Sequence, residues 1–269
     1  AWLSSNTPEL VKKHDLADID RRLCSYCLSL ATDTEGHNLF ELLALRRFFS
    51  FLDKYEFRRK SVKKVLLAME SFRFPTKKGM RTLRLSPIQV FLLCCIYGFY
   101  KGNGRRLTQY VMLFVPRKFG KTTLVAGIAE YDLIFGDSDA QVYVCANSYN
   151  QAKICFDNIR NSLRSIDRSG TKFRVNREAI YNFMKGKTSY ARCLASDPST
   201  LDGLNASTYI LDEYSQSKSA GLRNVMATST GTRDNPLELI ITTASDLQDG
   251  PCVETLRSYR SILMGDQQD

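Results

Sequence analysis

The stretch of sequence that points most directly to chemistry is a short loop between two regular segments. Residues 115–123 read Val-Pro-Arg-Lys-Phe-Gly-Lys-Thr-Thr, after a β-rich run at 109–115 and before a helix-forming run at 121–135. Glycine lets backbone amides close around phosphate oxygens, the positive end of the next helix faces them, lysine adds a charge, and a threonine hydroxyl can bind Mg²⁺. The predicted phosphate-binding residues are Lys118, Gly120, Lys121, Thr122 and Thr123, with Thr122 also binding the metal.

The loop departs from the standard phosphate-binding pattern in two ways. Val115 stands five residues before Gly120, where the pattern has another glycine. Arg117 adds a second fixed cation, which could reach the γ-phosphate or pair with a catalytic acid. We therefore predict a variant loop in which Arg117 takes part in nucleotide binding and in catalysis.

Two adjacent carboxylates follow a buried, apolar run later in the chain. The run at 208–211 leads into Asp212 and Glu213, and open α/β sheets bind their ligands at the carboxyl ends of strands. Phosphoryl transfer needs a carboxylate for the metal and a group that orients the attacking water. We therefore predict that Asp212 binds Mg²⁺ through its water shell and that Glu213 polarises the water. Capping of the next helix is the structural alternative.

A further apolar run, at 237–243, predicts another strand that is buried on both faces. The hydroxyl groups of Thr242, Thr243 and Ser245 would then lie at the same edge of the sheet as the loop. They could sense the γ-phosphate, although strands that end in Thr or Ser are common.

The order of the segments predicts an α/β fold with a parallel sheet and covering helices, because strand-like and helix-like runs alternate. The helix-like run at 151–163 carries an apolar stripe at helical spacing, which would lie on the sheet. The chain is irregular from 171 to 196, with possible hairpin strands. The alternating runs are 109–115, 121–135, 141–146 and 151–163.

The first 80 residues differ from the rest in composition. They are rich in Leu, Lys, Arg and Glu and poor in β-branched runs, which favours helices. The stretch 74–79, Phe-Pro-Thr-Lys-Lys-Gly, is the best candidate for a linker or turn. We therefore predict a helical N-terminal region at 1–80 and a second domain at 81–269, which carries the phosphate-binding P-loop and which the resemblance described below identifies as an ATPase domain.

Composition narrows the class of protein. The 269-residue chain has a formal net charge of +10, and residues 46–84 hold thirteen Lys or Arg against three acids. This block favours a polyanionic partner, and a solvated basic face is the alternative.

The eight cysteines indicate buried thiols rather than disulfides, and a zinc site at Cys24 and Cys27 is disfavoured because no second such pair follows. The longest apolar run, 90–100, is shorter than the roughly 20 residues of a membrane span, and secretion is unsupported.

Five motifs, in order and spacing from about residue 83 to 265, make the sequence similar to the large terminase subunit of tailed phages. That resemblance implies a P-loop NTPase core of the ASCE, RecA-like class, with helices on both faces of the sheet, that hydrolyses ATP with Mg²⁺. The motifs are LSPIQ (85–89), VPRKFGKTT (115–123), NSYNQAK (147–153), LDGLNASTYILDE (201–213) and TRDNPLELIITTAS (232–245).

The resemblance also implies roles for single residues. Gln89 would read the adenine, and Arg117 would be the cation that the family carries in its loop. Thr243 and Ser245 would belong to the motif that couples hydrolysis to movement. Arg233 would be the arginine finger that reaches a neighbouring subunit, ahead of Arg192 and Arg223.

The implied partners are double-stranded DNA, the portal protein, the small terminase subunit and further copies of the chain. These copies would form a ring on the procapsid, in the cytoplasm of the infected bacterial host and away from any membrane. Family members carry a second, nuclease domain, and here only about 24 residues follow Ser245. We therefore expect the chain to be the motor domain of a longer protein.

Two other functions fit part of the pattern. A helicase-like DNA-dependent ATPase would share the loop and the paired acids, but it needs a second motor domain. A DNA-binding packaging subunit with a weak nucleotide site is the alternative from another class. A Glu213→Ala variant that binds ATP without turnover would separate an enzyme from that subunit. A GTPase is disfavoured because the sequence has no N-K-x-D motif.

Overall fold

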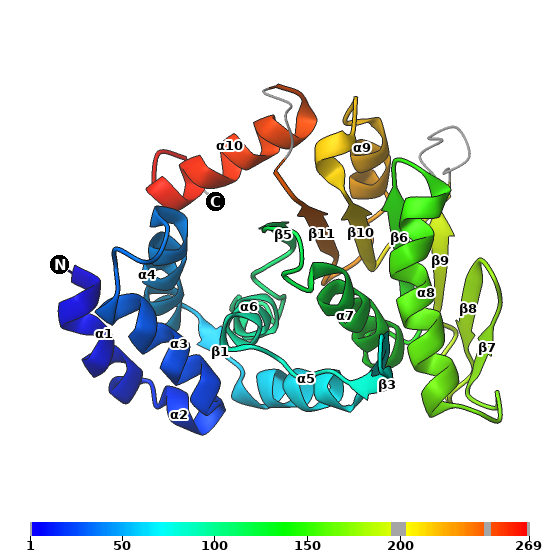
Figure 1. The fold of residues 1–269 in the computed structure, drawn as a ribbon, viewed down its shortest axis with the longest axis horizontal. Helices are drawn as coiled ribbons and strands as arrows, with labels where there is room; N and C mark the ends of the chain where they lie inside the picture. Colours follow the sequence, from blue (N-terminus) through cyan, green and yellow to red (C-terminus); the bar gives the residue numbers. More distant parts are fainter. Residues whose placement is uncertain (1, 195–202, 245–248, 268–269) are drawn as a thin grey trace. The chain divides into compact units, whose positions relative to one another are not determined.

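The computed structural model describes residues 2–194, 203–244 and 249–267 (Figure 1). The backbone forms two compact units. The first unit comprises Ala1–Leu67, Arg84–Thr108 and Thr255–Asp269, and the second comprises Ala68–Leu83 and Gln109–Glu254. The predicted domain boundary after residue 80 stays a prediction.

The first unit is helical, as predicted for the N-terminal region. Asn38 caps one helix by accepting hydrogen bonds from the amides of Phe40 and Glu41. The ring of Phe48 packs against those of Phe91 and Phe99 in the core of this unit. Its helices are α1 (Trp2–Lys13), α2 (Leu16–Ile19), α3 (Arg21–Thr32), α4 (Leu39–Lys54), the start of α5 (Arg59–Ser71), α6 (Pro87–Tyr97) and the end of α10 (Pro251–Met264), with short strands β1 (Glu56–Phe57) and β4 (Phe99–Tyr100).

The second unit is built on a seven-stranded sheet, which confirms the predicted α/β fold. Its strand order is β5-β11-β10-β6-β9-β8-β7. The first five strands of that order are parallel, and β8 and β7 extend the sheet in antiparallel fashion. The strands are β5 (Tyr110–Phe114), β6 (Gln141–Ala146), β7 (Phe173–Val175), β8 (Ala179–Asn182), β9 (Tyr190–Leu194), β10 (Thr208–Asp212) and β11 (Leu237–Thr242).

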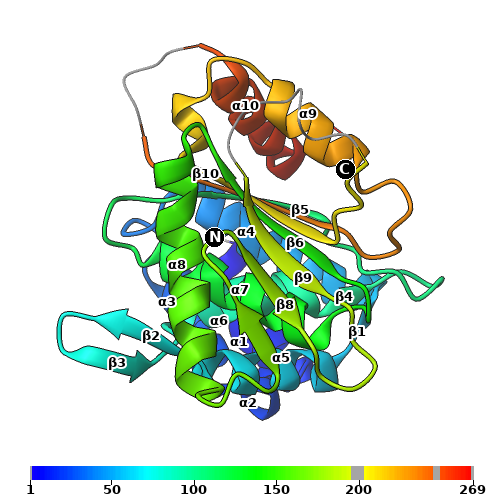
Figure 2. The ribbon, with the colours of Figure 1, turned by 90° about the vertical axis from the view of Figure 1, so that its right-hand side faces the viewer.

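Helices cover both faces of this sheet, as predicted (Figure 2). α7 (Lys121–Phe135) and α8 (Tyr149–Ile166) lie on one face, where the Thr208 hydroxyl donates to Asp132 of α7 at 2.6 Å. On the other face, Met226 of α9 (Gly221–Thr228) and Cys252 at the start of α10 join an apolar cluster with Tyr209 and Ile240. The core therefore lies in two layers around the sheet.

A separate hairpin in the second unit pairs β2 (Arg73–Thr76) with β3 (Gly79–Thr82). It contains the stretch at 74–79 that the sequence offered as a linker or turn. The structure shows the turn, between paired strands. None of the helices in the described part of the chain is long and apolar enough to cross a membrane.

Candidate active site

The predicted phosphate-binding loop joins the end of β5 to the start of α7. Its first residue stays attached to the sheet, since the amide of Val115 donates to the Thr242 carbonyl at 3.2 Å. Lys118 (φ 69°) and Gly120 (φ 85°) adopt left-handed backbone conformations. Gly120 is the residue just before α7, and glycine takes this conformation without steric cost. The loop thus ends in a tight turn that leads into a helix N-terminus.

The first residue of α7, Lys121, lies in the interior of the site. Its side chain is 11% exposed, and its Nζ donates to Oε1 of Glu213 at 2.7 Å. Arg117 and Lys118 are exposed, whereas Thr122 and Thr123 are half-buried in the first turn of α7. The unpaired amides of that turn carry partial positive charge. The loop therefore presents donors and cations where a phosphate chain could bind.

The two predicted carboxylates occupy the carboxyl end of β10. Asp212 is the last residue of the strand, and Glu213 follows with a left-handed φ of 50°. Such a conformation in a residue other than glycine costs on the order of 1 kcal/mol and is concentrated at functional sites. Oε2 of Glu213 accepts from the Thr243 hydroxyl at 3.4 Å. Lys121, Glu213 and Thr243 therefore converge from α7, β10 and the end of β11.

Asp212 has the environment expected of a metal-binding carboxylate. The residue is buried, and its Oδ1 has no hydrogen-bond partner among the residues that the structure describes. Burial and the neighbouring charge of Glu213 raise the pKa of Asp212 to about 6, and the Lys121 charge offsets part of that shift. Mg²⁺ uses one or two carboxylates together with water and substrate phosphates. The unpaired oxygen of Asp212 and the hydroxyl-bearing turn at Thr122 fit such an ion.

The raised pKa of Asp212 predicts a pH-dependent effect on stability. The folded protein holds this proton more tightly than the unfolded chain, so the group stabilises the fold below about pH 4 and loses that contribution as pH rises through about 6. We expect Asp212→Asn, measured without Mg²⁺, to raise the free energy of unfolding at pH 8 by on the order of 1–3 kcal/mol, with little effect at pH 4. Urea denaturation at both pH values measures it. Asp249 is exposed, so Asp249→Asn should leave the free energy of unfolding unchanged at both pH values. If Asp212→Asn did not stabilise the protein at pH 8, burial would not be the cause of the raised pKa of Asp212.

A group of side chains that the sequence reasoning left without a role supports the turn after Glu213. Asn147, at the end of β6, accepts from the Ser217 hydroxyl at 2.9 Å and donates to the Glu213 carbonyl at 3.5 Å. Gln151 donates to Oε1 of Gln216 at 2.9 Å. The NSYNQAK stretch directly follows a strand at the same sheet edge, which was the signal available in the sequence. These contacts hold the short 3₁₀ turn Tyr214–Gln216 beside Glu213.

Gln89 and Ser245 are the two remaining predicted nucleotide-binding residues. Gln89 lies in the first unit at the start of α6, where its Oε1 accepts from the Ser86 amide and its own amide donates to the Ser86 hydroxyl. This reciprocal capping box stabilises the helix start. The adenine-reading role of Gln89 stays a prediction. Ser245 lies outside the residues that the structure describes.

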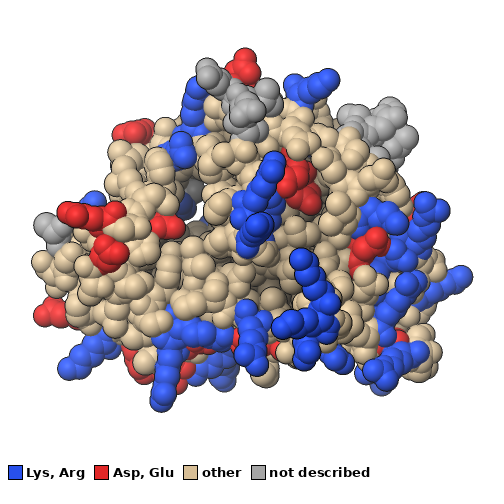
Figure 3. Space-filling view, in the orientation of Figure 1, with Lys and Arg blue, Asp and Glu red and all other residues tan. Residues whose placement is uncertain are grey.

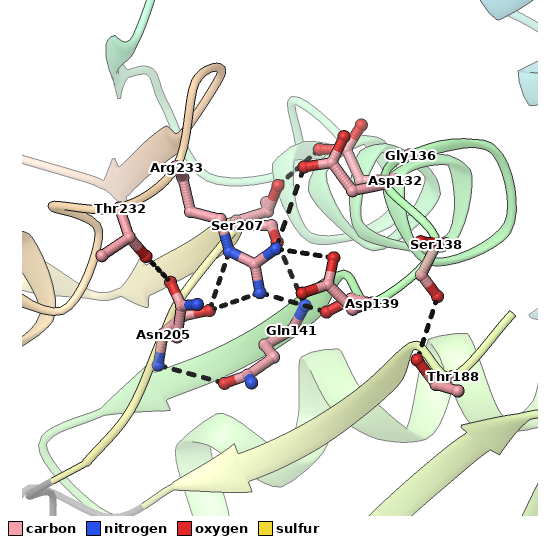
Figure 4. Close-up of polar contacts among 12 residues, drawn as sticks. Asp132, Gly136, Ser138, Asp139, Gln141, Thr188, Asn205, Ser207, Thr232 and Arg233 are labelled. Atoms are coloured by element: carbon pink, nitrogen blue, oxygen red, sulfur yellow. Dashed lines mark hydrogen bonds and ion pairs between the residues drawn. The ribbon is translucent and has the colours of Figure 1, made fainter.

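The structure does not bring Arg233 to the loop. Its side chain is 6% exposed and lies near the amino ends of β6 and β10, at the sheet edge opposite Lys121 (Figure 4). The guanidinium donates to Oδ1 and the carbonyl of Asp139 at 2.9 and 3.1 Å, and to the Asn205 carbonyl from two nitrogens. It would have to leave these contacts to reach a neighbouring subunit. The geometry favours a structural role, and the finger assignment stays untested.

The other two arginines differ in their availability. Arg223 of α9 forms a two-pronged ion pair with the buried Glu238 at 2.9 Å from each of two nitrogens. Arg192 of β9 is exposed, and its guanidinium lies 5.1 Å from the centre of the Tyr190 ring. Of these three candidates, Arg192 is therefore the most exposed to a neighbouring molecule.

The contacts of Arg233 predict a large effect on stability. We expect Arg233→Ala to lower the free energy of unfolding by about 2–3 kcal/mol, because the Asn205 carbonyl and Asp139 lose a charged donor. Binding of ATP to the remaining folded protein should be unchanged, and Arg192→Ala should leave stability within about 0.5 kcal/mol. Urea denaturation and equilibrium ATP binding measure the two effects. Lost ATP binding with intact stability would contradict the structural role.

The loop, the carboxylates and the strand order define a class of protein. One strand, β11, lies between the loop strand β5 and the carboxylate strand β10, which is the arrangement of a P-loop ATPase of the ASCE class. Residues 87–261 match the family model described as "Terminase large subunit, ATPase domain". The chain therefore belongs to the large terminase family and corresponds to its ATPase domain.

Comparison with solved structures supports the same fold. The large terminase of bacteriophage HK97 is 22% identical over 76% of this chain and 42% of its own length, with a TM-score of 0.61. The large terminase ATPase domain of a Thermus phage is 20% identical over 65% of this chain and 72% of its own length, with a TM-score of 0.47. The N-terminal domain of the phi29 DNA packaging ATPase is 17% identical over 56% of this chain and 80% of its own length, with a TM-score of 0.40. No curated protein matches. The chain thus spans less than half of the HK97 protein.

Proposed function

We propose that the chain hydrolyses ATP at the loop between β5 and α7 and that this hydrolysis drives double-stranded DNA into a phage procapsid. The observation that carries the proposal is the convergence of Lys121 and Thr243 on Glu213. Beside them lies a buried Asp212 oxygen that has no hydrogen-bond partner among the described residues. Cation, carboxylate and hydroxyl groups from three elements meet at one sheet edge. Membership of the large terminase family supports the direction of the proposal.

ATP binding requires a rearrangement of one ion pair. Lys121 exchanges the carboxylate of Glu213 for the β- and γ-phosphates, which the amides in the first turn of α7 also bind. The released Glu213 carboxylate then orients the attacking water and accepts its proton. Thr122 and Asp212 hold Mg²⁺, which neutralises charge on the phosphates when it is bound. The ion pair therefore keeps the general base occupied until substrate arrives.

The remaining residues have supporting roles in this proposal. Arg117 and Lys118 extend from the loop toward the phosphates and offset negative charge, and Thr123 adds a donor in the first helical turn. Thr243 contacts Glu213 directly, so this hydroxyl and that of Ser245 couple the state of the γ-phosphate to β11. Gln89 reads the adenine.

The partners follow from the family. Copies of the chain form a ring docked on the portal of the procapsid, in the cytoplasm of the infected host, and the small terminase subunit delivers the DNA. An arginine from one copy completes the site of its neighbour. Arg192 is the exposed candidate, whereas Arg233 and Arg223 are held in ion pairs.

The proposal is tested by ATP turnover at increasing protein concentration, with and without linear duplex DNA. If the site is completed in trans, turnover rises faster than linearly with protein concentration and increases when DNA is added. A rate indifferent to DNA at every concentration contradicts the DNA motor. ATP binding and DNA binding without any turnover would favour a packaging subunit with a weak nucleotide site.

A further inference from the structure

The β2–β3 hairpin is a hydrogen-bonded, cationic projection of the second unit. Its strands pair from Arg73 with Thr82 to Thr76 with Gly79. The Thr76 hydroxyl donates to the Gly79 carbonyl at 2.7 Å and accepts from the Lys78 amide at 3.1 Å, which fixes the turn. In Figure 2 the hairpin extends past α8. The turn lysines are therefore presented by an ordered element.

The hairpin packs mainly on α8, and at its base Phe74 of β2 and Met69 of α5 also approach α7, the helix that begins at Lys121. Phe72 and Phe74 are 3% and 2% exposed, and Met69 is fully buried. A Cβ at Gly127 of α7 would lie 2.8 Å from Cε of Met69 and 3.7 Å from Cζ of Phe74, so the glycine permits this close approach. Burial of each such side chain stabilises the contact by about 1.5–3 kcal/mol. The hairpin is thus held on α8 and, through Phe74, lies close to the helix that follows the phosphate-binding loop.

The exposed part of the hairpin carries positive charge without nearby acids in the sequence. Lys77, Lys78 and Arg81 are exposed, and no Asp or Glu occurs between residues 71 and 129. The adjoining helix α8 adds Lys153, Arg160 and Arg164 against one acid, Asp157, which pairs with the first two. Figure 3 shows Lys and Arg side chains outnumbering acids over α8 and the neighbouring strands. This surface would attract a polyanion.

We propose that the β2–β3 hairpin contacts the phosphate backbone of double-stranded DNA and passes that contact to α7. The proposal rests on the proposed DNA motor. Lysine and arginine contacts to phosphates are independent of sequence, as required of a surface past which DNA of any sequence moves. The close approach of Phe74 to Gly127 links the same hairpin to the helix that presents Lys121. DNA binding and DNA-stimulated turnover should therefore both depend on it.

The test compares two triple variants of the full chain that each remove three exposed cations from the second unit. The hairpin variant is Lys77→Ala, Lys78→Ala, Arg81→Ala, and the control is Lys172→Ala, Arg174→Ala, Arg177→Ala around β7. Binding of a fluorescent 30-base-pair duplex is measured by anisotropy across a salt series. The slope of log K against log salt is negative, and each lost phosphate contact reduces its magnitude by about 0.9.

We expect the hairpin variant to bind the duplex at least about tenfold more weakly and the magnitude of its salt slope to be smaller by about 2–3. We also expect that DNA no longer stimulates its ATP turnover. Its turnover without DNA and its melting temperature should match those of the wild type. A chain with the conservative changes Lys77→Arg and Lys78→Arg keeps both charges and should bind the duplex as the wild type does. The decrease in log K for duplex binding should be less than half as large in the control variant as in the hairpin variant.

Two outcomes overturn the hairpin proposal: duplex binding by the hairpin variant equal to that of the wild type, or an equal loss of duplex binding in the control variant. A wild-type chain that binds no duplex at any salt concentration contradicts the proposed DNA motor instead. Because DNA binding is measured without ATP, failure of the nucleotide site cannot be mistaken for failure of the hairpin.

Discussion

Replacing Glu213 with glutamine should reduce ATP turnover by about 10²–10⁴-fold, the usual contribution of a positioned general base, while ATP still binds. Glutamine keeps the size of the side chain and an oxygen that can accept from Lys121, but it cannot take a proton from water. The weaker attraction between glutamine and Lys121 should leave ATP affinity unchanged or slightly higher. Phosphate release and equilibrium binding of a fluorescent ATP analogue measure the two effects.

A matched change at an exposed glutamate of the same unit provides the control. Glu178 lies between β7 and β8 and is exposed, so Glu178→Gln should leave turnover within about twofold. If Glu213→Gln retained turnover within a few-fold of the wild type, Glu213 would not be the base. If it lost ATP binding together with turnover, Glu213 would be needed to build the site.

Replacing Lys121 with alanine should abolish turnover by a different route, through loss of phosphate binding. The lysine is buried at the start of α7, where no other described side chain donates to Oε1 of Glu213. Removing a preorganised donor to developing charge typically costs 10²–10³-fold in rate, and here ATP affinity should fall as well. Isothermal calorimetry with a non-hydrolysable ATP analogue and Mg²⁺ measures the binding.

Lys218→Ala is the control for this change, because Lys218 is an exposed lysine a few residues after Glu213. It should leave both affinity and turnover unchanged. Wild-type affinity in Lys121→Ala would place the phosphates elsewhere. A melting temperature that collapses in Lys121→Ala but is preserved in Lys121→Met would attribute the instability to lost packing of the aliphatic chain, because both variants leave Glu213 without its cation.

The parts of the site that the sequence predicted are those encoded by local patterns. The loop at 115–123 lies between a strand and a helix, and Asp212 ends a strand, because the apolar runs on either side determine both elements. Parallel strands then bring their carboxyl ends to one edge. The order β5-β11-β10, with one strand between loop and carboxylates, came only from the structure and the resemblance.

The interactions that the sequence could not predict are between residues distant in the chain. The ion pair of Lys121 with Glu213 spans 92 positions, and that of Arg233 with Asp139 spans 94. Nothing local to Arg233 indicated that its guanidinium would be buried, so an exposed finger and a structural arginine looked alike. Tertiary packing determines both ion pairs.

One structural signal was readable in the sequence and was given a different meaning. Ser86-Pro-Ile-Gln89 before an apolar run matches the capping-box pattern, with proline at the first helical position. Both hydrogen bonds of that box form. The stretch at 74–79, predicted as a linker or turn, had the Pro, Gly and Lys of a loop, whereas its first residue, Phe74, and the preceding Phe72 are core residues.

The most direct test of the central claim is steady-state ATP turnover by the purified chain with Mg²⁺ and linear duplex DNA, measured beside Lys121→Ala and Glu213→Gln. The account predicts turnover that requires Mg²⁺, rises faster than linearly with protein concentration and disappears in both variants, with ATP binding retained only in Glu213→Gln. Turnover in the wild type that neither substitution changes would contradict the assigned site.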